Sequence, residues 1–167
     1  MRSTPILQAF AMSKVAVTGA SGFVGRHVVE ALVRRGAEVV LVSRDPGKIV
    51  PHTGRTTRVQ LDISQPDGAF ERMGRPDILI HLAWDGLPNY KSLRHIEEEL
   101  PRQFTFLKHV IKDGLPNLTV SGTCLEYGMQ SGSLKETDFC EPVTPYGFAK
   151  LALCRQWSFC NRSSPSI

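Results

Sequence analysis

Short apolar runs alternate along this chain with longer stretches in which apolar residues recur at helical spacing. Segments 15–17 and 39–42 are uninterrupted apolar runs, as in buried strands, whereas the apolar residues of 24–33 would share one face of a helix. The same contrast repeats further along the chain. We expect strands near 14–18, 38–43, 57–61, 77–82 and 117–122 and helices near 23–35, 66–73, 90–112 and 145–158.

This alternation of strands and helices predicts an α/β fold. Each helix would carry the chain to a neighbouring strand, so the sheet is parallel and doubly wound, with helices on both faces. Right-handed crossovers give the five expected strands the order 3-2-1-4-5. Pro101 lies inside the longest expected helix, where its missing backbone N–H predicts a kink or break.

A glycine-rich segment, 18–25, joins the first strand to the first helix. Its spacing is G-x-x-G-x-x-G, which differs from the usual G-x-G-x-x-G of dinucleotide-binding loops. Gly19 would allow the tight turn, Gly22 the approach of a phosphate to the main chain, and Gly25 close packing of the helix on the strand. The helix N-terminus offers N–H groups and a positive dipole end. The segment therefore predicts a pyrophosphate site in a strand–helix–strand unit.

A second pattern places Tyr146 and Lys150 four residues apart, on one face of a helix that begins near Pro145. A free phenol, with a pKa of about 10, is a poor base at neutral pH. A nearby ammonium stabilises the phenolate, so the pair suits proton transfer. Taken alone, the pair also fits a half-buried aromatic beside an exposed helix charge.

Length and composition fit one domain with a single core. The chain has 167 residues, of which 41% are hydrophobic. The expected domain covers 13–156, between a disordered leader at 1–12 and an irregular, serine-rich tail at 157–167.

Charge and cysteine spacing exclude several classes of function. The formal net charge is +4, and the basic residues are scattered, which is typical of solvated surface and not of a nucleic-acid interface. No apolar run is long enough to span a membrane, and the N-terminus lacks a signal-peptide pattern. Cys124, Cys140, Cys154 and Cys160 have no metal-ligand spacing. We therefore expect free thiols, no metal and a cytoplasmic location.

The motifs T-G-A-S-G-F-V-G and Y-G-F-A-K together resemble the extended short-chain dehydrogenase/reductase family of nucleotide-sugar epimerases, dehydratases and reductases. The resemblance covers about residues 13–155 and includes S-G-T-C-L-E-Y-G at 121–128, L-D-I at 61–63 and H-L-A at 81–83. It implies a Rossmann-type domain that binds NAD(P) and a nucleotide sugar.

The resemblance also implies roles for individual residues. Tyr146 would transfer the hydroxyl proton, Lys150 would assist it and bind the nicotinamide ribose, and Thr123 would hold the substrate oxygen. For Thr123, the alternative is a strand-end hydroxyl that caps a turn. The expected cofactor contacts are Gly19, Ser21, Gly22, Phe23, Val24, Gly25, Ser43, Arg44, Asp62, Ile63, Leu82, Ala83, Trp84, Tyr146 and Lys150. Trp84 would contact the sugar or pack under its loop.

The end of the second strand favours NADP(H), with NAD as the alternative. Members that bind NAD carry an acid there, on the ribose 2′-hydroxyl. This chain has Ser43 and Arg44, which suit a 2′-phosphate. Asp45 comes later and precedes Pro46, as in a turn.

Within the family, Cys124 and Leu125 exclude dehydration, because dehydratases carry Asp and Glu after the catalytic Thr. What remains is 4-keto reduction, 4-hydroxyl oxidation or 4-epimerisation of the sugar. Segments 122–129 and 83–90 look most like the dTDP-6-deoxy-L-talose 4-dehydrogenase type of reductase. A catalytically inactive dinucleotide-binding module, such as a sensor or regulatory partner, is the alternative from another class. The sequence leaves the sugar and the direction of reaction open.

The family is usually about twice as long, with a C-terminal substrate lobe. We therefore expect a truncated product that lacks this lobe, folds marginally, turns over no sugar and exposes its fifth strand as an edge. Extended members often dimerise through these two helices, so the resemblance also implies a homodimer through apolar faces of 90–112 and 145–158.

Overall fold

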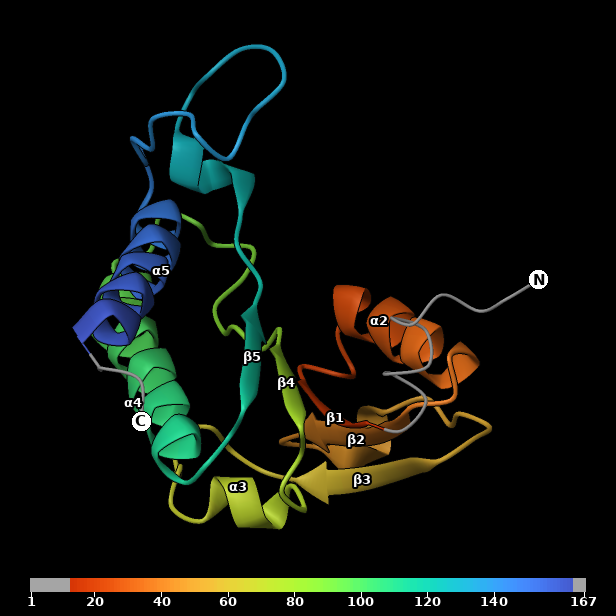
Figure 1. Cartoon of the computed structure of the whole chain (residues 1–167). Helices are drawn as coiled ribbons and strands as arrows, with labels where there is room; N and C mark the ends of the chain where they lie inside the picture. The colour runs from red at the N-terminus through yellow and green to blue at the C-terminus, as the bar shows by residue number, and fades with distance from the viewer. Residues whose placement is uncertain (1–12, 164–167) are drawn as a thin grey trace. The chain divides into compact units, whose positions relative to one another are not determined.

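A computed structural model describes residues 13–163, with side chains to Ser158. Five strands form one parallel sheet in the order β3-β2-β1-β4-β5 (Figure 1), which confirms the predicted topology. The strands are β1 (Lys14–Thr18), β2 (Glu38–Ser43), β3 (Thr56–Gln60), β4 (Ile78–His81) and β5 (Asn117–Val120). The expected leader at 1–12 lies outside the described residues, as does the end of the expected tail, 164–167.

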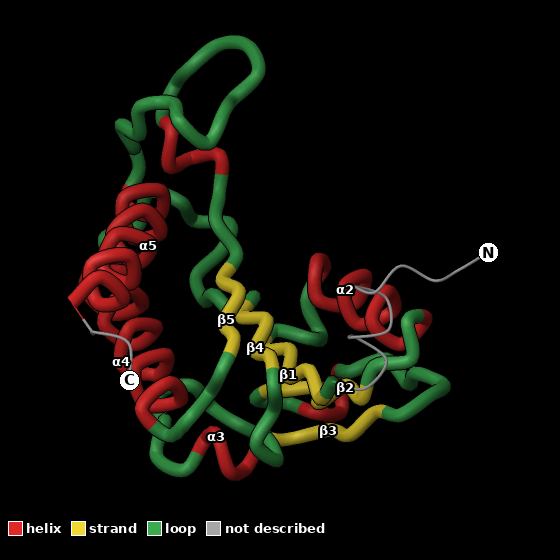
Figure 2. The backbone as a smooth tube through the Cα atoms, viewed as in Figure 1, coloured by secondary structure: helices red, strands yellow, loops and turns green. Residues whose placement is uncertain are grey.

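The helices correspond to the predicted ones, with three corrections to their bounds (Figure 2). The expected helix at 66–73 is shortened to one turn, the helix at 90–112 begins only at His95, and the helix at 145–158 extends to Ser163. Gly86 and Pro88, both poor helix formers, lie in the irregular segment before His95. The helices are α2 (Phe23–Arg34), α3 (Ala69–Arg72), α4 (Leu100–Lys112), α5 (Pro145–Ser163), the 3₁₀ turns η1 (Pro46–Lys48) and η3 (Cys124–Tyr127), and the π-helical turn η2 (His95–Glu99).

Pro101 does not break its helix. It lies in the first turn of α4, directly after the π-helical turn η2. Proline has no N–H to donate to the preceding turn, and in this chain that turn is the π-helical η2 and not a regular α-helical turn. The irregularity therefore lies in η2, and α4 continues to Lys112.

The described chain divides into two compact units. The first comprises the residues up to Ala83 and Phe106–Ser121, and it contains the whole sheet. The second comprises Trp84–Thr105 and the residues from Gly122 onward, including η2, η3 and α5. The single domain expected from the sequence thus contains two compact units.

The core of the first unit lies on the central strands. β1 and β2 are buried almost throughout, and α2 lays Val29 and Leu32 against them. Unbroken apolar runs suit parallel strands that are covered on both faces. The buried cluster consists of Val15, Val17, Ala20, Val29, Leu32, Ala37, Val39, Leu41 and Ile49.

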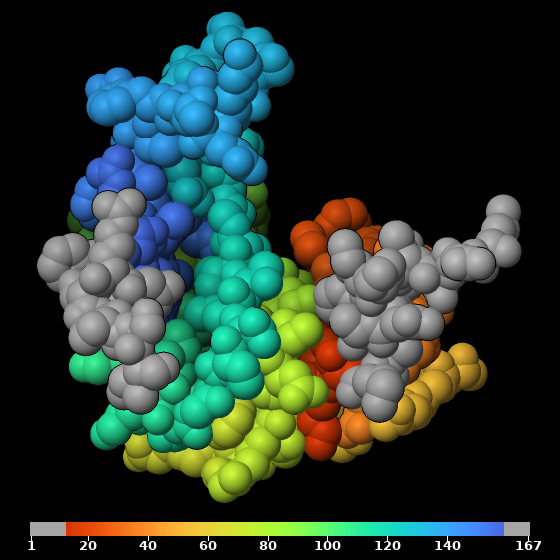
Figure 3. Space-filling model, in the orientation of Figure 1, coloured from red at the N-terminus to blue at the C-terminus, as the bar shows by residue number. Residues whose placement is uncertain are grey.

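β5 is an edge strand, as the predicted order requires. Its burial alternates, with Asn117 and Thr119 exposed and Leu118 and Val120 partly buried. The teal segment that contains β5 lies open on the visible face in Figure 3. This alternation is typical of a strand with one face covered and the other exposed to solvent.

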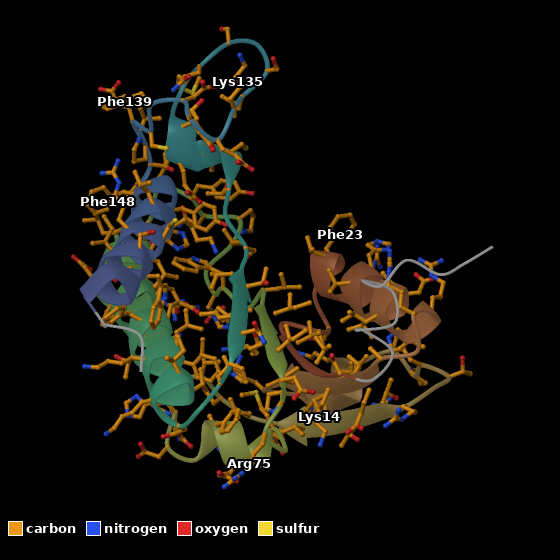
Figure 4. The ribbon with its side chains drawn as sticks, in the orientation of Figure 1. Lys14, Phe23, Arg75, Lys135, Phe139 and Phe148 are labelled. Atoms are coloured by element: carbon orange, nitrogen blue, oxygen red, sulfur yellow. The ribbon has the colours of Figure 1, made fainter. Side chains whose placement is uncertain are left out.

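In the second unit, an irregular segment, 128–144, links η3 to α5. It carries exposed side chains that include Lys135 and Phe139 (Figure 4). The Gln130 side-chain amide donates to the carbonyls of Tyr127, at 2.9 Å, and Phe139, at 2.6 Å. These two bonds close the segment into a loop. Its apolar side chains contribute little, because most of them are exposed.

The carboxyl ends of β1 and β4 are tied together by a buried polar contact. Thr18 Oγ1 lies 2.7 Å from His81 Nδ1, and the backbone N–H of Leu82 donates to the same hydroxyl at 3.2 Å. The His81 ring stacks on Phe106, with ring centroids 5.3 Å apart. The hydroxyl therefore satisfies two buried polar groups at once.

Replacing Thr18 with Val should lower the free energy of unfolding by about 1–3 kcal/mol, because the valine matches its shape but removes the hydrogen bond between the hydroxyl and the buried His81 ring. Urea denaturation measures the loss. Thr18→Ser, which keeps the hydroxyl, is the matched control. Equal stability of the Val and Ser variants would contradict the assigned role.

Candidate active site

The glycine loop between β1 and α2 allows backbone to approach backbone. Gly19 has a φ of 72°, and a Cβ there would lie 2.9 Å from the backbone nitrogen of Ala83. A Cβ at Gly25 would overlap the carbonyl oxygen of Gly19. Gly22 donates its N–H to the same carbonyl at 2.9 Å. Two of the three glycines are therefore required by close contacts, as the sequence predicts for this loop.

The first turn of α2 is open to an anion. Gly22 precedes the helix and provides no side-chain cap, and the first turn contains no acidic residue. Phe23 and Val24 are 75% and 55% exposed, and Phe23 is labelled at the helix start in Figure 4. An uncapped helix N-terminus after a glycine turn fits the pyrophosphate of a dinucleotide.

The end of β2 carries a hydroxyl and a cation. Ser43 Oγ lies 3.5 Å from Ser21 Oγ of the glycine loop, and Arg44 is exposed. The Asp45 carboxylate accepts the N–H of Gly47 at 3.0 Å and so caps η1. Asp45 is therefore a turn residue, as predicted.

The remaining predicted cofactor contacts of the first unit follow β3 and β4. Asp62 and Ile63 are partly buried, and Asp62 accepts the N–H of Ser64 at 2.9 Å. Leu82 and Ala83 are also partly buried, and their backbone lies against Gly19. The first unit thus brings the glycine loop together with the ends of β2 and β4.

The second unit holds the predicted proton-transfer pair at the start of α5. Tyr146 and Lys150 are only 8% and 4% exposed. The backbone N–H of Tyr146 donates to the Tyr90 carbonyl at 3.2 Å. The Tyr146 ring lies among the rings of Trp84, Tyr90 and His95, at centroid distances of 5.6, 5.5 and 5.2 Å.

Burial dominates the protonation of both groups. It raises the pKa of Tyr146, while a hydrogen bond with Thr123 lowers that pKa. Burial lowers the pKa of Lys150 to about 8, against the opposing effect of the Glu126 charge. The structure therefore brings Thr123 to the phenol and gives Lys150 an amine that titrates close to neutral pH.

Thr123 also caps η3. Its hydroxyl accepts the N–H of Leu125 at 3.4 Å, and Glu126 Oε1 accepts the N–H of Thr123 at 2.8 Å. This reciprocal capping box fixes the residue at the start of the turn. The two interpretations of Thr123, a turn cap and a partner of the phenol, are compatible in this geometry.

Sequence reasoning missed His95 and Glu99, which are completely buried in the second unit. His95 accepts the indole N–H of Trp84, and Trp84 itself lies under the predicted pair and not in open solvent. No motif indicates these contacts, because they depend on the π-helical turn. The sequence shows only that a His and a Glu lie four residues apart within the expected helix at 90–112.

Metal clusters and membrane-spanning helices are both absent from the part of the chain that the structure describes. No group of His, Cys, Asp and Glu side chains is arranged to hold a metal ion. No helix within 13–163 combines the length and apolar character needed to cross a bilayer. Cys124, Cys140 and Cys154 are free thiols.

Comparisons with known proteins agree with the geometry. The profile of the NAD dependent epimerase/dehydratase family matches residues 15–163. The chain is similar to dTDP-6-deoxy-L-talose 4-dehydrogenase (NAD(+)) of Aggregatibacter actinomycetemcomitans, with 27% identity over 140 residues, or 81% of this chain and 51% of that protein.

Solved structures of similar fold include two nucleotide-sugar complexes. MoeE5 in complex with UDP-glucuronic acid and NAD is 30% identical, with a TM-score of 0.71 over 85% of this chain and 47% of that one. UDP-glucose-4-epimerase from Stenotrophomonas maltophila, with bound NAD and formylated UDP-arabinopyranose, has a TM-score of 0.79 at 22% identity, over 93% of this chain and 50% of that one. The chain thus spans about half the length of these relatives.

Replacing Lys150 with Met should stabilise the protein near neutral pH. The pKa of Lys150 is lowered from 10.5 to about 8, so between these values the unfolded chain holds the proton more tightly and stability rises with pH. Below that window the charged amine destabilises the fold, and Lys150→Met removes up to about 3 kcal/mol of this effect.

Denaturation across the same pH range measures the change, with exposed Lys112→Met as the control. The slope of stability against pH should flatten in Lys150→Met alone. An unchanged slope would contradict the assignment.

Proposed function

The chain belongs to the NAD dependent epimerase/dehydratase family, and from that membership we propose that it oxidises or reduces the C4 position of a nucleotide-activated sugar. The observation that carries this proposal is the cluster in the second unit. A buried phenol accompanies Thr123, and a buried lysine follows one helical turn later. Such a group is suited to moving a hydroxyl proton.

Each residue of the cluster has a distinct task in the proposed reaction. Tyr146 takes the proton of a sugar hydroxyl during oxidation and returns it during reduction. Thr123 binds the same oxygen and holds it in line with the phenol. Lys150 in its charged form stabilises the phenolate. A nicotinamide dinucleotide, when bound, accepts or supplies the hydride.

Two alternative functions are also compatible with the chain. Epimerisation at C4 needs the same proton transfer in both directions, and one structural relative is named an epimerase. A binding module without catalysis needs only the glycine loop. Dehydration is not proposed, because Cys124 and Leu125 supply neither the acid nor the base that would follow Thr123.

The finer proposal on the coenzyme is a preference for NADP(H). Arg44 is exposed at the end of β2, Ser43 lies beside it, and Asp45 is engaged in capping η1. The Asp45 carboxylate therefore caps a turn, and its contacts do not direct it to a ribose 2′-hydroxyl. The similar dehydrogenase is named for NAD(+), and the MoeE5 complex contains NAD, so NAD is the alternative coenzyme.

A homodimer through 90–112 and 145–158 is also a proposal. It is supported by Phe148, which is 49% exposed on α5 (Figure 4). Leu151 and Leu153 of the same helix are buried. One apolar ring of α5 is thus available to a second copy.

Tyr146→Phe should lower the turnover of a 4-keto nucleotide sugar by about a hundredfold or more and leave the dissociation constant of the dinucleotide within about twofold. The change removes the atom that carries the proton and little else. Coenzyme oxidation followed by absorbance measures turnover, and calorimetry measures binding. Tyr90→Phe, a neighbouring ring on an exposed loop, is the matched control.

If the unmodified chain binds a dinucleotide but consumes none with any 4-keto sugar, the binding-module alternative holds. If Tyr146→Phe retains most of the activity, Tyr146 is not the acid and base.

Arg44→Ala should weaken binding of NADPH by about tenfold and leave NADH within about twofold, because it removes a cation that only the 2′-phosphate needs. Titration of both coenzymes measures this selectivity. Arg26→Ala is the control. Arg26 lies over the Phe23 ring in the first turn of α2, away from the end of β2, so its loss should lower the affinities for NADPH and NADH alike. NADH binding as tight as that of NADPH in the unmodified chain would overturn the preference.

A further inference from the structure

A pair of hydrogen bonds fixes the buried ring of His95. The indole Nε1–H of Trp84 donates to His95 Nδ1 at 3.1 Å, and His95 Nε2 lies 2.8 Å from the carbonyl oxygen of Asn89. An indole only donates and a carbonyl only accepts, so the proton is on Nε2 and Nδ1 is the acceptor. The side chain is 0% exposed, so no water competes for either nitrogen.

The backbone around this ring is also held. A Cβ at Gly86 would lie 3.2 Å from His95 Cε1, and Gly86 has a φ of 86°. The buried carboxylate of Glu99 accepts the N–H of Asp85 at 3.3 Å and the side-chain amide of Gln103 at 3.1 Å. The segment that carries Trp84 is therefore bonded to η2 and to the first turn of α4.

The indole that His95 holds lies under the predicted proton-transfer pair. Lys150 Nζ is 4.6 Å from the centroid of the Trp84 ring. The Tyr146 ring meets the same indole edge-on, at 5.6 Å and an interplanar angle of 75°. A cation over an indole face is stabilised by the ring quadrupole. Rotation of Trp84 would thus change the surroundings of both groups.

We propose that His95 is a positioning residue, which holds the Trp84 indole as the surface on which the Lys150 ammonium rests. The proposal deepens the proposed function, because it concerns the same pair. His95 lies beside the Tyr146 ring, at 5.2 Å between centroids, and it acts on Lys150 through Trp84. A purely space-filling role would require only a ring of this size among Trp84 and Tyr146.

Two substitutions separate hydrogen bonding from shape. His95→Gln keeps one acceptor for the indole and one donor for the Asn89 carbonyl. His95→Phe keeps a ring and removes both bonds. His109→Phe, on the last part of α4, where the imidazole lies 3.6 Å from the Asp67 carboxylate, controls for the general effect of the change.

The first readout is the indole N–H resonance of Trp84. The chain has two tryptophans, and Trp157→Phe leaves one; among the described residues, Trp157 Nε1 has no hydrogen-bond partner, so the change removes no bond. The Trp84 resonance should be protected from solvent exchange in the parent and in His95→Gln. Protection should fall by about tenfold or more in His95→Phe.

The second readout is the titration midpoint of Lys150, followed through its ε-carbon signal and assigned with Lys150→Arg. Burial is the main cause of its lowered pKa, and a released indole admits water. The midpoint should rise by about half a unit or more in His95→Phe and stay within about 0.2 units in His95→Gln. Trp84→Ala, which removes the ring and opens the space beside Lys150 to water, should show the same rise if His95→Phe does not fold.

Equal indole protection in the Gln and Phe variants, or an unchanged Lys150 midpoint, would overturn the proposal. Turnover then separates it from the proposed function. If indole protection and the Lys150 midpoint change as expected but the chain turns over no sugar, the proposed function is rejected and the positioning role of His95 is retained. In an active chain, His95→Phe should lower kcat by about tenfold with coenzyme binding within about twofold, and His95→Gln should restore it.

Discussion

The burial of one ammonium group governs the second unit. A lysine that leaves water loses solvation that apolar surroundings do not replace. At Lys150 the face of the Trp84 indole and the charge of Glu126 act against this loss. Burial consequently lowers the pKa of Lys150 to about 8, which is close to neutral pH. Trp84 lies against that group, and the rings of Tyr146 and His95 both contact the Trp84 ring.

The first unit depends on a different constraint, the contact of backbone with backbone. Gly19 touches the strand end at Ala83, and Gly25 touches Gly19, so the loop has no room for side chains on its inner side. Thr18 and His81 join the two strands on which the loop is built. A glycine turn of this kind is rigid because its backbone atoms are in contact, and not because its residues are large.

The sequence predicts the parts of this molecule that depend on local patterns. Strand order follows from alternation and handedness, and the turn role of Asp45 follows from the proline after it. The contact of Trp84 with His95 could not be predicted, because it joins an irregular segment to a π-helical turn and neither has a periodic signal. The division into two units was missed for a related reason. Composition measures the amount of apolar surface, not where the chain crosses from one cluster to another.

The capping box at Thr123 links the phenol to the backbone. A hydroxyl has one proton and two lone pairs, and one lone pair is already used by the N–H of Leu125. Towards Tyr146, Thr123 can therefore accept a proton from the phenol or donate its own to the phenolate, but not do both. Where the neutral phenol donates to Thr123, ionisation of Tyr146 reverses the direction of that bond, and the electron density at the threonine oxygen changes with it. The amide of Leu125 is thus an internal reporter of the state of the phenol, placed on the main chain by the fold itself.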